Sequence, residues 1–328
     1  MYAEFKESDF MKKYIGHDSQ FCSVEEHRLV GGKGDGMRLL EVNNGNGIMF
    51  TLSLDRAGDI SRLFKDGKNL GFFAPCGYVS PVYYDKQGVG FLKSFTAGFL
   101  TTCGLTAVGN PCFDDGEELP LHGNISHVPA ENVNWWIDDT IHIKITVRDA
   151  SLFGHKLLMT REYECPVGGD EITISDTVKN IGNEETPYML LYHFNIGYPL
   201  LSENSIVAVK NKGVKPRNLR AEEGLEDALL MEKPQIGFEE QCYYYDMQEG
   251  YAEIYNPEIN TRLSLSYDIK DLPFFTEWKM MGNGEYVLGL EPGNCSPDGR
   301  DVMRKEGKLQ FLKAGEEKKS KIVIRINN

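Results

Sequence analysis

The feature that most constrains the fold is the alternation of apolar and polar residues in many short segments. In residues 47–55 (GIMFTLSLD), Ile48 and Phe50 fall on one face, because successive side chains of a strand point to opposite faces. Residues 141–148 and 171–178 alternate in the same way. Each segment is therefore expected to be a strand with one buried face.

Strand patterns extend over most of the chain, whereas helical patterns are few. Gly, Asn and Asp residues typical of turns separate the strands, which favours an all-β fold, an antiparallel sandwich or barrel. Two segments have helical spacing, residues 7–15 and the acidic stretch 221–233. The other expected strands are residues 157–164, 188–196, 251–255, 262–267, 285–291 and 321–326.

The chain of 328 residues is 41% hydrophobic, which is enough for a large core. Neither an internal repeat nor a linker rich in Pro and Ser divides it. We therefore expect a single domain over residues 1–328, with residues 1–44 as an N-terminal extension that packs on it. The expected assembly is a monomer or a homodimer.

Charge and cysteine content limit the partners and the compartment. The net charge of −14 argues against nucleic acid or an anionic membrane as the main partner. Apolar runs are too short for a membrane span, and charged residues occupy the positions where a signal peptide is apolar. The seven cysteines are scattered and form no C-x-x-C pair, which indicates reduced thiols in the cytoplasm.

The segment 285–299 (EYVLGLEPGNCSPDG) places a carboxylate at the end of an apolar strand. Glu291 shares a face with Gly289, whose missing side chain leaves room for a ligand above the sheet. Burial would raise the pKa of this carboxyl group toward the range of a general base. The alternative is a strand-end glutamate in solvent or in an ion pair.

The segment 188–200 (YMLLYHFNIGYPL) places His193 and Asn195 side by side on one face of an otherwise apolar strand. Two polar side chains in such a place need hydrogen-bond partners or a ligand. A neutral histidine there can act as a general acid or base near neutral pH. The alternative is a core histidine with its hydrogen bonds satisfied inside the protein.

Two other segments combine residue types that suit a sugar. Arg56 and Asp59 lie at a strand end, where a guanidinium can donate paired hydrogen bonds to hydroxyls or can form a salt bridge within a turn. Trp278 and Lys279 follow one another in a polar segment. An exposed Trp can stack on a sugar ring, whereas a core Trp is the more common case.

The segment 119–127 (LPLHGNISH) holds two of the seven histidines. A metal centre would need three or four converging ligands, for which His122, His127, His193 and Glu291 are the candidates. Their spacing matches neither H-x-H nor H-E-x-x-H, so no metal ligation is expected.

Together, these motifs resemble the aldose 1-epimerase (galactose mutarotase-like) family, from about residue 45 onward. That family has a Leu-His-Gly segment, a strand of the His-x-Tyr-Phe-Asn type and a strand that ends in Glu, with Pro-Asp a few residues later. The corresponding residues here, in the same order, are Leu121-His122-Gly123, His193-Phe194-Asn195, Glu291 and Pro297-Asp298. Residues 56–60 and 100–105 are similar to an Arg-Gly-x-Asp-Ile-like element and a Leu-Thr-Thr-Cys-Gly-Leu segment of a less characterised branch.

The resemblance implies a β-supersandwich of two large antiparallel sheets that binds a carbohydrate on a concave face. It also implies an enzyme that interconverts sugar anomers without a metal or other cofactor. Glu291 would take the proton of the anomeric hydroxyl, His193 would protonate the ring oxygen, and His122 would hydrogen-bond near that oxygen. The expected substrate-binding residues are Arg56, Asp59, Asn195, Trp278 and Lys279.

The chain departs from the family pattern at Asn124, where the family has a second glycine after the histidine. Asp246 is the candidate for the family's substrate-binding aspartate. Two other function classes stay open: a non-catalytic carbohydrate-binding protein on the same scaffold, and a metal-dependent sugar isomerase or lyase. Lys93, Lys279 and Arg300 are the basic residues expected to select an anionic sugar.

Overall fold

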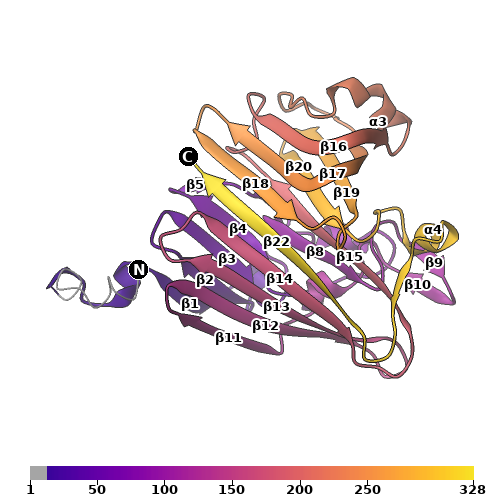
Figure 1. Ribbon diagram of the computed structural model, residues 1–328, viewed down its shortest axis with the longest axis horizontal. Coiled ribbons are helices and arrows are strands. Elements are labelled where there is room, and N and C mark those ends of the chain that lie inside the picture. Colours follow the sequence, from indigo (N-terminus) through magenta and orange to yellow (C-terminus); the bar gives the residue numbers. More distant parts are fainter. Residues whose placement is uncertain (1–12) are drawn as a thin grey trace.

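The computed structural model describes residues 13–328, and its largest element is an antiparallel sheet of thirteen strands (Figure 1). The sheet order is β11 (Asn132–Ile137), β12 (Thr140–Ala150), β13 (Lys156–Pro166), β14 (Glu171–Asn180), β22 (Glu317–Asn327), β18 (Thr261–Tyr267), β17 (Gln241–Asn256), β19 (Phe274–Gly282), β20 (Glu285–Gly293), β15 (Thr186–Ile196) and β21 (Gln310–Leu312). In addition, β16 (Ile206–Pro216) pairs with β17, and β8 (Leu100–Leu105) pairs with β15.

A second antiparallel sheet contains five strands in chain order: β1 (Ser23–Arg28), β2 (Arg38–Asn43), β3 (Ile48–Ser53), β4 (Asp59–Lys65) and β5 (Lys68–Asn69). Two short ribbons pair β6 (Phe72–Phe73) with β7 (Ala97–Gly98) and β9 (Cys112–Asp114) with β10 (Glu117–Leu119). The α-helices in the described part of the chain are short, α3 (Leu219–Glu223) and α4 (Arg300–Lys305). The expected all-β class with large antiparallel sheets and few short helices is confirmed.

The strands predicted from alternation are present, often with longer ends than the pattern indicated. The helix predicted over residues 221–233 is wrong in extent, because α3 ends at Glu223, with Gly224 as its C-cap, and a single 3₁₀ turn follows. The helix predicted over residues 7–15 lies almost entirely outside the described residues. Within residues 13–328, no helix has the length and apolar character needed to cross a membrane.

The two sheets pack face to face through their apolar sides. Phe50 of β3 lies against Tyr163 of β13, with 6.3 Å between ring centroids, and both side chains are buried. At Gly58 the two sheets approach closely, since a Cβ atom there would lie 2.5 Å from the side chain of Ile145 on β12. The alternation in these strands thus supplies the shared core between the sheets.

A buried charge network also joins the sheets. Arg161 of β13 donates to Asp176 of β14 (2.9 and 2.6 Å) and to Asp59 of β4 (2.7 Å). Asp59 also accepts hydrogen bonds from the backbone N–H (2.8 Å) and the hydroxyl (2.5 Å) of Thr102 on β8. Both oxygens of Asp59 are therefore satisfied inside the protein, and the prediction that this side chain binds a sugar hydroxyl is replaced by a structural role.

We predict that Asp59→Ala lowers the free energy of unfolding by about 3–5 kcal/mol, because it leaves Arg161 buried with one partner removed. Urea denaturation followed by circular dichroism would measure this loss. The control is Glu249→Ala, which removes an exposed ion pair with Lys210 (2.6 Å) and should leave the midpoint nearly unchanged. A stable Asp59→Ala protein with weakened sugar binding would contradict the structural role.

Candidate active site

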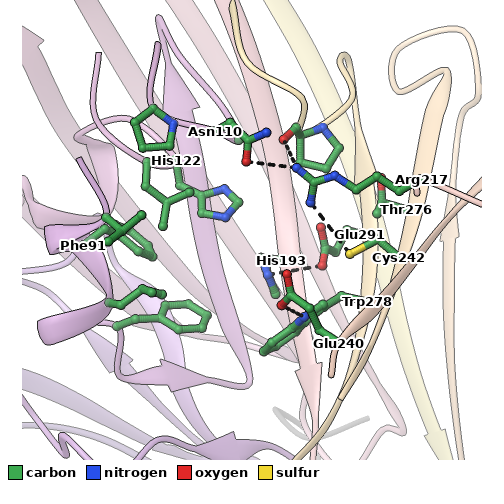
Figure 2. Close-up of a pocket in the computed structure, with 17 residues that line it drawn as sticks. Phe91, Asn110, His122, His193, Arg217, Glu240, Cys242, Thr276, Trp278 and Glu291 are labelled. Atoms are coloured by element: carbon green, nitrogen blue, oxygen red, sulfur yellow. Dashed lines mark hydrogen bonds and ion pairs between the residues drawn. The ribbon is translucent and has the colours of Figure 1, made fainter. Parts of the chain in front are cut away.

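The site is built on the pairing of β15 with β20. Phe194 lies opposite Leu290 and Asn195 lies opposite Gly289 in this antiparallel pair. His193 and Glu291 therefore project from adjacent positions on the same face. Their side chains are buried, and His193 Nε2 lies 3.2 Å from Glu291 Oε1 (Figure 2).

A tight turn brings His122 over this pair. His122 and Gly123 both have positive φ angles (59° and 74°), and a Cβ atom on Gly123 would lie 2.3 Å from the carbonyl oxygen of Gly104. Backbone hydrogen bonds hold the turn, from His122 N to Gly109 O (2.9 Å) and from Gly104 N to His122 O (3.0 Å). The His122 ring is consequently edge-on to the His193 ring, with 5.7 Å between centroids.

These three side chains line a cavity of about 260 Å³. One wall carries His122 and Phe91, and the facing wall carries Glu291, Arg217 and Trp278 (Figure 2). The other lining residues are Val89, Leu92, Phe95, Gly109, Asn110, Pro111, Leu121, His193, Glu240, Cys242, Thr276 and Pro297. An apolar, aromatic wall with a few converging polar groups is typical of a small-molecule site.

Burial shifts the protonation equilibria of all three groups. It raises the pKa of Glu291 to about 8, with a partial opposing effect of the nearby Arg217 cation. It lowers the pKa of His193 to about 3 and that of His122 to about 4. At neutral pH the site therefore holds a protonated carboxyl group beside two neutral imidazoles.

Three polar side-chain atoms of the residues that line this cavity have no hydrogen-bond partner among residues 13–328. They are Nδ1 of His122, Nδ1 of His193 and Oε1 of Glu291, and all three are buried. The 3.2 Å contact between His193 and Glu291 lacks hydrogen-bond geometry. Because buried polar atoms are nearly always paired in proteins, these three atoms are available for the hydroxyls of a ligand.

Arg217 and Glu240 were not identified from the sequence. Arg217 follows β16 and donates to Asn110 Oδ1 (2.9 Å), while its Nε lies 3.6 Å from Asp298. Glu240 precedes β17 and accepts a hydrogen bond from the indole of Trp278 (2.7 Å). Both lie where strands begin or end, outside any periodic pattern, so no local signal in the sequence singled them out.

Several residues expected in the site lie elsewhere. Lys279 is adjacent to Trp278 in β19 but projects from the opposite face, where it donates to the carbonyl oxygen of Asp227 (2.9 Å). Arg56 is buried near the five-stranded sheet and donates to Val79 O (3.3 Å). Asn195 lies two residues after His193 on β15 and donates to the backbone oxygen of His193 (2.9 Å), and it is not among the residues that line the cavity.

The residues expected to select an anionic sugar are also not in the cavity. Lys93 pairs with Asp85 (2.7 Å), and Arg300 is buried against Asp114 (2.7 Å). With Lys279 on the other face of the sheet, this basis for anion selectivity is wrong. Asp246 likewise lies outside the cavity lining.

His127, the second histidine of the segment 119–127, does not line the cavity. Its ring stacks on Tyr84 with 3.8 Å between centroids, and its Nε2 contacts the hydroxyl of Ser94 (2.9 Å). Among residues 13–328, no three His, Cys, Asp or Glu side chains are grouped so as to hold a metal ion.

The sequence predicted that a ligand would occupy the space above Gly289. In the structure, the side chains of Glu291 and Trp278 occupy this space. A Cβ atom at Gly289 would lie 2.6 Å from Glu291 Oε1 and 2.9 Å from Trp278 Cβ. The absence of a side chain therefore lets the Glu291 carboxyl group and the Trp278 indole lie close together on the sheet.

The raised pKa of Glu291 predicts that Glu291→Gln stabilises the protein at alkaline pH. The wild-type carboxyl group is ionised above pH 4.5 when unfolded but stays protonated to about pH 8 when folded, so stability is lost as pH rises through this window. The free energy of unfolding of the variant should exceed that of the wild type increasingly from pH 4.5 to 8. A difference that does not change with pH would contradict the raised pKa.

Comparisons with known proteins agree on the fold. The family profile described as "Domain of unknown function (DUF4432)" matches residues 34–326. A structure from Klebsiella pneumoniae, named as a candidate aldose 1-epimerase, has a TM-score of 0.89 and 24% identity and covers 94% of this chain and 86% of its own. A galactose mutarotase-like protein from Clostridium acetobutylicum has a TM-score of 0.67 and 16% identity, with 94% and 99% covered. No curated protein matches the chain.

At these sequence identities, the structural similarity establishes the galactose mutarotase-like fold. It does not establish an activity, which has to be inferred from the residues of the site. The family match covers nearly all of the described residues. The chain therefore belongs to the family described as Domain of unknown function (DUF4432).

Proposed function

We propose that this protein is an aldose 1-epimerase that interconverts the anomers of a sugar without a cofactor. The observation that carries the proposal is the buried pair of His193 and Glu291, which lines a cavity together with His122 and has polar atoms without hydrogen-bond partners among residues 13–328. The cavity volume of about 260 Å³ is close to the lower end of ligand sites and suits one small ring. The fold shared with mutarotase-like proteins supports the same reading.

The chemistry needs one proton held by the pair. Ring opening removes a proton from the anomeric hydroxyl and adds one to the ring oxygen, so a base and an acid must act together. Between about pH 3 and pH 8 the pair of His193 and Glu291 holds one proton. That proton resides on Glu291 in the resting pair, and its transfer to His193 gives the reactive carboxylate and imidazolium without any change in total charge.

In the reactive form, Glu291 takes the proton of the anomeric hydroxyl while His193 donates a proton to the ring oxygen. The bond between C1 and the ring oxygen breaks, and the aldehyde rotates about the C1–C2 bond. The two transfers then reverse: His193 removes the proton from the sugar hydroxyl as it attacks the other face of C1, and Glu291 returns a proton to the C1 oxygen. The pair regains its starting protonation state, so the cycle is balanced.

The surrounding side chains support binding in this proposal. Trp278 and Phe91 offer aromatic faces on the two sides of the cavity, and Glu240 and Arg217 present polar groups to sugar hydroxyls. His122 would donate or accept a hydrogen bond near the ring oxygen through its unpaired Nδ1.

We expect Glu291→Gln and His193→Gln each to reduce anomer exchange by about 10²–10⁴-fold, because each removes one member of the acid–base pair. NMR exchange spectroscopy over a panel of aldoses measures the rate. The control is Lys93→Ala, which removes an exposed side chain paired with Asp85 outside the cavity and should keep the wild-type rate. Tight sugar binding without acceleration by the wild type would contradict catalysis and support a carbohydrate-binding protein instead.

The pH dependence of kcat/KM follows from the single shared proton. We expect a plateau at neutral pH and a fall above about pH 8, where the proton leaves the pair and no acid remains. Rates from polarimetry between pH 5 and pH 10 would show the alkaline limb. A rate that rises through pH 8 would mean that the fully deprotonated pair is the active form, against the shared-proton mechanism.

A further inference from the structure

A second cavity of about 560 Å³ adjoins the candidate active site. Its lining includes Tyr244, Phe274 and Thr276, of which Thr276 also lines the first cavity. Tyr244 and Phe274 are both half-buried, so part of each aromatic side chain is accessible. The function proposed above makes no use of this cavity.

The two cavities share one continuous sheet face as their floor. In the pairing of β17 with β19, Cys242 lies opposite Trp278 under the first cavity, and Tyr244 lies opposite Thr276 at the junction. Phe274 comes two residues further along β19, on the same face. The four residue steps from Phe274 to Trp278 span about 13 Å of strand, which gives the floor room for two adjoining sugar rings.

A polar cluster lies at the junction of the two cavities. The Tyr244 hydroxyl donates to Asp298 Oδ1 (2.6 Å), and Arg217 Nε lies 3.6 Å from the same oxygen. Tyr244 and Asp298 line the second cavity, whereas Arg217 lines the first. A molecule in either cavity would therefore contact groups that are held by the same carboxylate.

The chemistry of the second cavity suits an uncharged ring with hydroxyls. Aromatic surface from Tyr244 and Phe274 provides stacking contacts. The charged lining residues, of which all except Asp298 are exposed, are Lys215, Lys308, Asp246, Asp298 and Glu306. Cations and carboxylates are nearly balanced, so the lining has no strong preference for an anion or a cation.

We propose that the second cavity binds the second ring of a reducing disaccharide or longer saccharide whose reducing-end ring occupies the site of His193 and Glu291. This inference rests on the proposed epimerase function. It fixes the orientation of the substrate, because a ring opens only where the anomeric hydroxyl is free. The substrate class is therefore a glycosidically extended sugar.

The test compares anomer exchange for aldoses and for disaccharides with the same sugar at the reducing end, such as glucose against maltose and cellobiose. We expect kcat/KM for at least one disaccharide to exceed that of its matched monosaccharide by about 10-fold. Phe274→Ala and the exposed double change Lys215→Ala with Asp246→Ala should each remove this advantage and leave the monosaccharide rate unchanged. Lys212→Ala, an exposed change on β16 outside the cavity, is the matched control.

The outcomes separate this inference from the function on which it rests. Monosaccharide exchange without any disaccharide advantage, or an advantage that survives both variants, would overturn the second ring site and leave the epimerase proposal intact. Independent binding of a free monosaccharide in the second cavity, without gain from linkage, would also overturn it. Failure of all the sugars to exchange faster than in buffer would overturn the epimerase function itself.

Discussion

The candidate site depends on the register between β15 and β20. Side chains alternate along each strand, so a slip of one residue would move His193 to one face and leave Glu291 on the other. The register is fixed on both sides, because β8 pairs with β15 and β19 pairs with β20 over most of their lengths. The acid–base pair is thus a consequence of sheet geometry, on rigid elements rather than on a loop.

The same rigid strands bury ionisable side chains in the cavity, where their loss of contact with water is unfavourable. Burial leaves His122, His193 and Glu291 with unpaired atoms and shifted pKa values, which is a cost to stability. The large core and the buried Arg161 network offset that cost elsewhere in the molecule. Separate parts of the sheet system therefore provide stability and reactivity.

Alternation in the sequence predicted the strands well, because burial of one face of a strand produces an apolar–polar pattern within that strand's own residues. The same reasoning predicted that His193 and Asn195 share a face, and that Glu291 ends a strand beside Gly289. It did not provide the partner of each strand, since register is a relation between distant segments. The proximity of His193 and Glu291 was accordingly an expectation from family resemblance, and the strand pairing now gives it a geometric basis.

Several residues predicted to bind the sugar lie outside the cavity for a similar reason. Arg56 and Asp59 have the residue types that bind sugars, yet the fold uses Asp59 to satisfy Arg161, which comes from another sheet. Lys279 follows Trp278 directly, and strand alternation places neighbours on opposite faces. Arg217 lies in an irregular segment after β16 and reaches the cavity through tertiary contacts with Asn110.

The central claim is that His193 and Glu291 hold one proton between them at neutral pH. Carbon-13 NMR of protein labelled at the glutamate carboxyl carbon tests it directly, with Glu291→Gln used to assign the signal. The variant is needed because burial also raises the pKa of Glu277 to about 8. We expect the Glu291 carboxyl group to stay protonated at pH 6 and to titrate near pH 8. A signal already ionised at pH 6, with His193 still neutral, would contradict it.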